Sequence, residues 1–213
     1  MKILLTLFSA YSIICLANVR SLNAEENPDR DFISYSVKQN SWLSLSGTTN
    51  INSFECRSSG EDSNGEILIN IIDQGNSISF SDAGIILEIN SFDCENQMIT
   101  RDMHKALGGR GDSGIEIKLL DAVAGEMNWY SANGKISTNI IITLNDISVT
   151  KELDISWQRT GGFDYQFGGT TELLMSEFEI DPPSPALGLV KVDDKIVVNF
   201  NYNVQTSAIS RVE

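Results

Sequence analysis

The chain has 213 residues, enough for one hydrophobic core, and carries 29 Asp and Glu against 15 Lys and Arg, for a formal charge of -14. A negative charge of this size repels the phosphates of nucleic acids and the headgroups of anionic lipids, so the sequence argues against both as partners. The charge does not argue against a lipid bound inside a cavity.

Residues 1–24 have the pattern of a secretory signal peptide. Lys2 precedes two apolar runs within residues 3–17, and the small residue Ala24 marks the expected cleavage site. Polar residues interrupt the apolar runs, whereas a membrane-spanning helix needs about 20 apolar residues in a row. We therefore expect an exported protein with no integral membrane span after cleavage, and residues 25–213 as a single domain.

Export leaves two cysteines, Cys56 and Cys94, in a compartment that favours disulfides. The third, Cys15, lies in the leader after a bulky isoleucine, whereas a lipidation signal has a small residue there. Cys56 and Cys94 end two nearly identical phrases, INSFEC at 51–56 and INSFDC at 89–94. In each phrase a phenylalanine stands two residues before the cysteine, so the two side chains share one face of a strand. We predict one disulfide between two neighbouring strands; a redox pair and a metal site are the weaker alternatives.

Much of the chain alternates apolar and polar residues with period two, which is typical of half-buried strands. The series are Ile67-Ile69-Ile71, Ile85-Leu87-Ile89, Ile115-Ile117-Leu119, Ile136-Ile140-Ile142-Leu144, Leu153-Ile155-Trp157 and Ile196-Val198-Phe200-Tyr202-Val204. Turn signals separate them, among others at 131–134, 159–162 and 192–195. Spacing this regular predicts an antiparallel sandwich or barrel.

Two segments depart from this pattern. Residues 96–107 place apolar side chains at helical spacing and are followed by Gly108, so we predict one short helix there. The stretch DPPSPALG at 181–188 is rich in proline, which donates no hydrogen bond to a sheet. We predict that it forms a rigid loop.

Four stretches, in this order, resemble the YceI-like family of exported bacterial lipid-binding proteins. WLSLSGTTNINSFEC at 42–56 resembles the family's opening strand pair, and ITRDMHKALG at 99–108 resembles its Arg-Asp-x-His helix. The segment 140–157 is similar to its hairpin of two long strands. The segment 175–202, with its Pro-Pro loop, resembles the ending of Bacteroidetes-type members. The stretch GGRGDSGIEIKLL at 108–120 departs from the family's usual phrase.

The resemblance implies an all-β fold, a lipocalin-like antiparallel up-and-down β-barrel of about eight strands with the helix near one end. It implies an apolar interior that holds a polyisoprenoid, quinone-type or fatty-acyl chain, and two barrel strands joined by Cys56 and Cys94. It also implies a periplasmic protein, with the cell surface or the medium as the other destinations, and it is compatible with a homodimer.

The candidate ligand contacts are inward apolar residues of the alternating series, with Trp42 near an opening: Trp42, Ile51, Leu87, Ile89, Ile140, Ile142, Ile155, Trp157, Phe200 and Tyr202. For each of them taken singly, an ordinary core position is the favoured alternative, because apolar residues are common on the inner face of a strand. Trp157 and Tyr202 could also hydrogen-bond a ligand head. Arg101, Asp102 and His104 are candidate head-group contacts, because the family's helix carries them. The alternative is that Arg101 and Asp102 make surface contacts and His104 faces solvent.

The sequence gives little support to catalysis. It has one His, neither GxSxG nor HExxH, and no free cysteine once the pair is oxidised. We therefore expect a non-enzymatic carrier of a lipid or isoprenoid, without cofactor or metal ion. The alternative is an envelope structural or stress-response interaction protein with a filled barrel and no ligand.

Overall fold

The computed structural model describes residues 30–59, 64–72, 77–81, 83–108, 114–123, 131–207 and 210–211. The expected signal peptide lies outside the described residues. The described chain is mostly antiparallel strands, with one α-helix, α2 (Gln97–Gly108), and the 3-10 helices η2 (Ile89–Ser91), η4 (Met175–Phe178) and η5 (Ala186–Gly188). The helix predicted near residues 96–107 is confirmed.

In the described parts of the chain, fourteen strands form one sheet. They are β1 (Arg30–Val37), β2 (Trp42–Thr49), β3 (Ser53–Ser59), β4 (Asn64–Ile72), β5 (Ser77–Ser81), β6 (Gly84–Leu87), β7 (Phe92–Asp93), β8 (Ile115–Leu119), β9 (Asp121–Val123), β10 (Asn133–Leu144), β11 (Ile147–Gly161), β12 (Asp164–Leu174), β13 (Val192–Thr206) and β14 (Ser210–Arg211).

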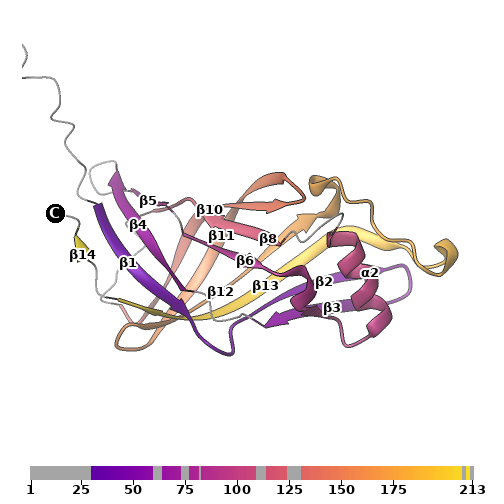
Figure 1. Ribbon diagram of the computed structural model, residues 1–213, viewed down its shortest axis with the longest axis horizontal. Coiled ribbons are helices and arrows are strands. Elements are labelled where there is room, and N and C mark those ends of the chain that lie inside the picture. Colours follow the sequence, from indigo (N-terminus) through magenta and orange to yellow (C-terminus); the bar gives the residue numbers. More distant parts are fainter. Residues whose placement is uncertain are drawn as a thin grey trace, which may run out of the picture.

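The strands occupy eight positions around a barrel, which we call staves. Four staves contain shorter strands that follow one another: β1 with β2, β3 with β4, β5 with β6 and β7, and β8 with β9. The other four are the long strands β10, β11, β12 and β13. Strands β1 and β2 both pair with β13, and β4 and β3 pair with β1 and β2. Strand β5 pairs with β4 and β9, and β6 pairs with β8. Strands β8, β10, β11, β12 and β13 then pair in succession. Each stave therefore pairs with the next in the chain and the last with the first, which confirms the up-and-down barrel (Figure 1).

The side-chain alternation predicted from the sequence holds where the strands are long. Along β10, buried residues alternate with more exposed ones, and Ile136, Thr138, Ile140, Ile142 and Leu144 are the buried set. Asn145 and Asp146 connect β10 to β11 with φ of 51° and 64°. A two-residue turn with positive φ at both positions matches the twist of the flanking strands, so the hairpin starts in register.

The turn predicted at residues 192–195 is wrong, because these residues begin β13. The hydroxyl of Thr48 donates to Asp193 at 2.6 Å, and the backbone N–H and hydroxyl of Ser176 donate to Asp194 at 2.8 and 2.6 Å. Because both carboxylates have donors on neighbouring elements, the strand continues through them. The pairing with β2 is irregular at this point.

The two repeated phrases lie side by side, but only the first supplies a long strand. Strand β3 pairs with the two-residue strand β7 through Arg57 opposite Asp93. The residues before β7 form η2, where the backbone N–H and the hydroxyl of Ser91 both donate to the carbonyl of Glu88, at 3.0 and 2.7 Å. These local hydrogen bonds turn the chain, so Ile89 is not part of a strand.

Candidate ligand-binding cavity

The interior of the barrel contains two chambers. The first has a volume of about 540 Å³ and lies at the end of the barrel that carries α2 (Figure 1). The second has a volume of about 500 Å³ and is lined by residues of β1 and of the C-terminal half of β13. Both volumes fall within the range of small-molecule sites, roughly 300–1,000 Å³.

The two chambers share four apolar lining residues, which we call the waist. Leu43, Ile117, Ile142 and Val198 line both chambers, and they come from β2, β8, β10 and β13. Strand β2 pairs with β13, and β8 pairs with β10, so the waist is built by two strand pairs. All four residues belong to or pack against one hydrophobic cluster, and the chambers lie on either side of it.

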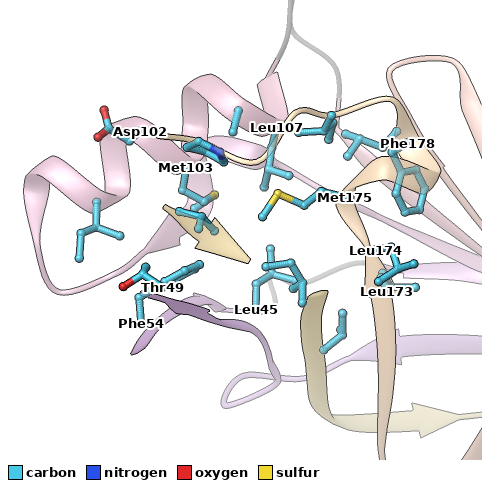
Figure 2. A pocket seen from close by; sticks show the side chains of 18 of the residues that line it. Leu45, Thr49, Phe54, Asp102, Met103, Leu107, Leu173, Leu174, Met175 and Phe178 are labelled. Carbon is cyan, nitrogen blue, oxygen red and sulfur yellow. The ribbon is translucent and has the colours of Figure 1, made fainter. Parts of the chain in front are cut away.

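Helix α2 covers the first chamber, and strands β2 and β3 form the opposite wall (Figure 2). The labelled apolar side chains lining it are Met103 and Leu107 from α2, Leu45 and Phe54 from β2 and β3, Leu173 and Leu174 from β12, and Met175 and Phe178 from η4. Its polar lining residues are Thr49, Asn52 and Asp102. The chamber is thus apolar apart from a few groups.

Exposed apolar side chains mark the mouth of the first chamber. Ile51, Met98 and Leu174 line it, and 68%, 63% and 41% of their surfaces are exposed. Each of the three comes from a different segment: the turn before β3, helix α2 and the end of β12. A ligand that enters between them would meet apolar surface from the outset.

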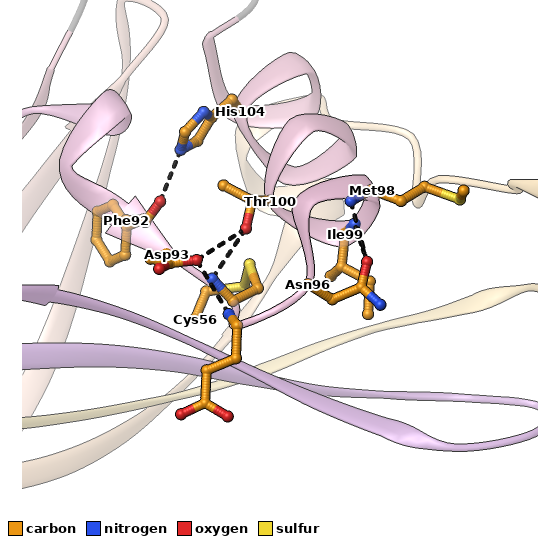
Figure 3. The surroundings of a disulfide bond; sticks show 10 residues. Cys56, Phe92, Asp93, Asn96, Met98, Ile99, Thr100 and His104 are labelled. Carbon is orange, nitrogen blue, oxygen red and sulfur yellow. Dashed lines mark hydrogen bonds between the residues drawn. A yellow bond between two sulfur atoms is a disulfide. The ribbon is translucent and has the colours of Figure 1, made fainter.

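Helix α2 is fastened to the barrel at its N-terminal end (Figure 3). Asn96 caps it, since its side-chain oxygen accepts hydrogen bonds from the backbone N–H groups of Met98 and Ile99 at 3.0 and 3.3 Å. The hydroxyl of Thr100 accepts from the N–H of Cys94 at 3.0 Å and donates to Asp93 at 3.2 Å.

The predicted disulfide between Cys56 and Cys94 is confirmed. Both cysteines are buried, and Cys94 lies three residues before α2. The bond therefore joins the segment that starts the helix to β3, the strand on the opposite wall of the first chamber (Figure 3). It is part of the framework of the candidate site.

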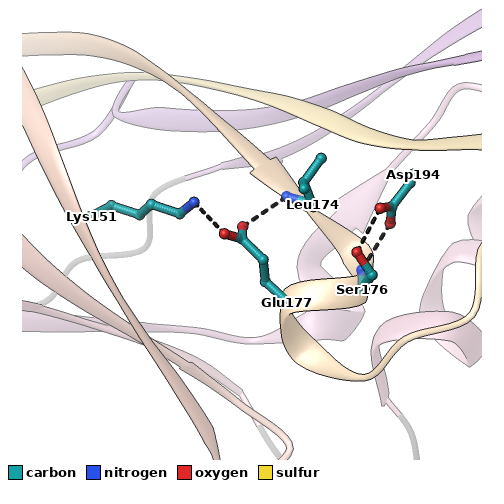
Figure 4. A network of polar contacts seen from close by, with 5 residues as sticks. All are labelled: Lys151, Leu174, Ser176, Glu177 and Asp194. Atoms are coloured by element: carbon teal, nitrogen blue, oxygen red, sulfur yellow. Dashed lines mark hydrogen bonds and ion pairs between the residues drawn. The ribbon is translucent and has the colours of Figure 1, made fainter.

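Hydrogen-bonded carboxylates hold η4 at the side of the first chamber (Figure 4). Glu177 accepts from Nζ of Lys151 at 2.6 Å and from the N–H of Leu174 at 3.0 Å. The Lys151 hydrogen bond is the main reason why the pKa of Glu177 is lowered. The pKa of Asp194 is lowered as well, chiefly by the hydroxyl of Ser176. These contacts place Met175 and Phe178 against the chamber.

The second chamber is lined by more aromatic and hydroxyl groups than the first. The hydroxyl of Tyr35 donates to the carbonyl of Gly84 at 2.8 Å, and that of Thr138 donates to the carbonyl of Asp121. Burial raises the pKa of Tyr35 and that of Tyr202, so both phenols are neutral near pH 7.

Arg159 is the charged residue among those that line the second chamber. It is exposed, and its Nε donates to the carbonyl of Gly162 at 2.8 Å in the β11–β12 turn. Asp102 has the corresponding place in the first chamber, at the helix end of the barrel. The middle of the interior is therefore free of formal charge among the described residues.

A comparison with solved structures finds the same barrel. A polyisoprenoid binding domain from Saccharophagus degradans implicated in plant cell wall breakdown aligns with a TM-score of 0.59, over 81% of this chain and 98% of that chain, at 9% identity. The present chain shares the fold of that domain. BcnA of Burkholderia cenocepacia aligns over 82% of this chain and 95% of its own, with 11% identity and a TM-score of 0.41. No protein-family model and no curated protein matches the sequence significantly.

Seven of the ten candidate ligand contacts line the shared interior. Ile51, Leu87 and Ile142 line the first chamber, and Ile140, Ile142, Ile155, Phe200 and Tyr202 line the second. The alternation of the strands therefore identified their inward faces, although whether these residues touch a ligand stays a prediction.

The other three candidates line neither chamber. Ile89 is buried on η2. The ring of Trp42 has the guanidinium carbon of Arg57 4.4 Å from its centre, whereas its neighbour Leu43 faces the interior. The indole of Trp157 lies against Gly134, where an added Cβ would come within 2.8 Å of Nε1. The missing side chain at position 134 leaves room for the indole, which therefore packs against the wall.

The three head-group candidates have separate surroundings. Asp102 lines the first chamber. Arg101 is exposed, and its Nε lies 3.8 Å from the carboxylate of Asp102. His104 is half-buried and, contrary to the solvent-facing alternative, its Nε2 donates to the carbonyl of Phe92 at 2.8 Å (Figure 3). The structure thus does not bring the three together at one point.

The side chains that close the first chamber are not among the residues predicted from the sequence. Ile99, Met103 and Leu107 line it from α2. Their spacing of four residues defines one face of a helix, and this signal could have identified them. Met175 and Phe178 come from the short helix η4. Its four residues are too few to show a repeating pattern of apolar side chains in the sequence.

Over the described parts of the chain, no three His, Cys, Asp or Glu side chains gather where they could hold a metal ion. None of the helices in these same parts has the length and apolar character needed to cross a membrane.

Proposed function

We propose that this chain is a YceI-like binding protein that holds one long apolar ligand, such as a polyisoprenoid or fatty-acyl chain, along the axis of its barrel. The observation that carries the proposal is the pair of apolar chambers of about 540 and 500 Å³, which adjoin at the waist inside one barrel. The common fold with a domain described as polyisoprenoid-binding supports it.

The energetics favour a ligand long enough to use both chambers. Each buried methylene contributes about 0.8 kcal/mol, and this gain must offset a cost of at least several kcal/mol for immobilising the ligand. A short chain confined to one chamber would leave apolar surface of the other in contact with water. The interior thus selects for length before it selects for any polar group.

The same proposal includes export and the absence of catalysis. Residues 1–24 are proposed as a cleaved signal peptide, and the disulfide supports an oxidising compartment such as the periplasm. The interior lacks a positioned acid and base pair among the described lining residues, since Asp102 and Arg159 line different chambers. The two chambers argue against the alternative of a filled barrel with a purely structural role.

Native mass spectrometry tests the proposal. The mature protein would be purified from its own envelope without detergent, weighed, and then extracted with solvent. We expect a stoichiometric apolar adduct that disappears on unfolding and whose mass identifies it. A clean apo mass, repeated after incubation with polyprenyl and fatty-acid mixtures, would contradict the carrier and favour the structural alternative. The same spectra would report whether the protein is a dimer.

A further inference from the structure

The hydroxyl of Tyr202 is buried in the second chamber and has no hydrogen-bond partner among the described residues. Tyr202 is on the inward face of β13, and its ring centre lies 6.0 Å from that of Phe200. A buried hydroxyl that lacks a partner costs free energy, so proteins seldom keep one that neither ligand nor water uses.

Neighbouring polar groups are committed to the protein itself. Tyr35 and Thr138 line the same chamber, and their hydroxyls donate to the backbone carbonyls of Gly84 and Asp121. A backbone carbonyl near the hydroxyl of Tyr202, or a phenylalanine at this position, would avoid the cost of an unpaired hydroxyl. The free hydroxyl of Tyr202 is therefore the feature that requires an explanation.

We propose that Tyr202 donates a hydrogen bond to an uncharged oxygen of the bound ligand, such as that of an alcohol, ketone, quinone or ester, and that the second chamber holds the ligand's polar end. This inference rests on the proposed function, because it presupposes a long ligand in the barrel. It places the polar end of the ligand in the second chamber and the apolar tail in the first.

An uncharged oxygen fits better than a carboxylate or phosphate. Phe200, Phe167 and Val37 line the chamber together with Tyr202. A charge in such surroundings would lose its hydration. Arg159 is the charged residue that lines this chamber, and its side chain is exposed, with Nε on the carbonyl of Gly162 in the turn after β11.

The tail then points toward the waist. Val198 precedes Tyr202 by four residues on β13, which is about 13 Å of strand. Both residues face the interior, so a chain whose oxygen lies beside Tyr202 reaches the waist within that length and continues into the first chamber.

The test compares two ligands that differ by one oxygen. Stearyl alcohol and octadecane, delivered from cyclodextrin, compete with the apolar dye diphenylhexatriene for the mature, oxidised protein and for Tyr202→Phe. Because the two compounds differ in hydration, the informative quantity is how the substitution changes the ratio of their affinities. We expect Tyr202→Phe to weaken the alcohol roughly fivefold and to leave octadecane unchanged.

Val197→Ala is the control, because Val197 lies on the same strand as Tyr202 and lines neither chamber. It should leave the ratio as in the wild type. Binding of octadecane by each variant shows that the variant is folded. If both compounds bind but Tyr202→Phe leaves the ratio unchanged, the inference is wrong and the proposed function stands. If neither compound nor dye binds, the proposed function fails as well. A Tyr202-dependent affinity for ionised stearate that exceeds that for the alcohol would overturn the assignment of an uncharged oxygen.

Discussion

Nε2 of His104 and the backbone carbonyl oxygen of Phe92 lie 2.8 Å apart, and their hydrogen bond ties the middle of α2 to β7. The helix covers the first chamber, which has a volume of about 540 Å³, and Ile99, Met103, Ala106 and Leu107 pack against the core. The contacts of His104, Thr100 and the Cys56–Cys94 disulfide add specific attachments to this apolar packing.

This position predicts that His104 stabilises the protein and does not contact the ligand's polar end. We expect His104→Ala to lower the free energy of unfolding by about 1 kcal/mol, the usual net value of a hydrogen bond, and to leave ligand retention unchanged. Lys105→Ala is the control, since Lys105 is an exposed neighbour on the same helix. Chemical denaturation and native mass spectrometry measure the two effects. Lost retention at unchanged stability would instead make His104 a ligand contact.

The disulfide should contribute more than any other single contact of α2. Cys56 and Cys94 are 38 residues apart. Closing a loop of this length lowers the conformational entropy of the unfolded chain and so raises the free energy of unfolding by roughly 4 kcal/mol. We expect the double variant Cys56→Ser, Cys94→Ser to lose about that much in denaturant unfolding. Reductant should bring the wild type to the same midpoint and should not move the double variant. A double variant as stable as the oxidised protein would contradict the prediction.

The waist should decide which ligand lengths are accepted. Val198→Phe adds bulk where the two chambers meet, so we expect it to weaken a long polyprenyl ligand tenfold or more and a short one much less. Overpacking also costs stability, about 1–3 kcal/mol. The matched control is Val197→Phe, because Val197 is next on the same strand and lines neither chamber. Equal loss of long and short ligands would mean that the chambers bind independently.

Acid should weaken the fold through the carboxylates that hold η4. The pKa values of Glu177 and Asp194 are both lowered in the folded protein, so their ionised forms favour folding. This stabilisation is present above the unfolded pKa values of about 4 and is lost as pH falls through the folded ones. We expect the urea midpoint of unfolding to fall as the pH is lowered through this range. In Glu177→Gln the midpoint should depend less on pH. An acid limb identical in the variant and the wild type would contradict this role of Glu177.

The barrel and its inward faces could be predicted from the sequence because the pleat of a strand forces alternate residues to opposite faces. Ile140, Ile142 and Val198 are interior for this reason. Trp157 has the same alternation, but the cross-strand partner Gly134 gives its indole a place in the wall, and such pairs are known only once the register is known.

Other parts of the site depend on contacts that no local pattern reveals. Ile89 continues an alternating series, yet the hydrogen bonds of Ser91 to Glu88 end the strand before it. Asp193 and Asp194 look like turn residues until Thr48 and Ser176, which are distant in sequence, supply their donors. The sequence predicts the walls of the cavity better than it predicts how the cavity is closed.

The barrel wall is built differently on its two sides. Strands β10 to β13 are uninterrupted runs of 12, 15, 11 and 15 residues, whereas each of the other four staves is made of two or three shorter strands in series. A break in a hydrogen-bonded ladder lowers the resistance of a wall to bending, and its amide protons should exchange with solvent sooner. We therefore expect the half of the barrel with continuous strands to be rigid and to fix the position of Tyr202. The half with interrupted strands should adjust more easily to ligand chains of different thickness.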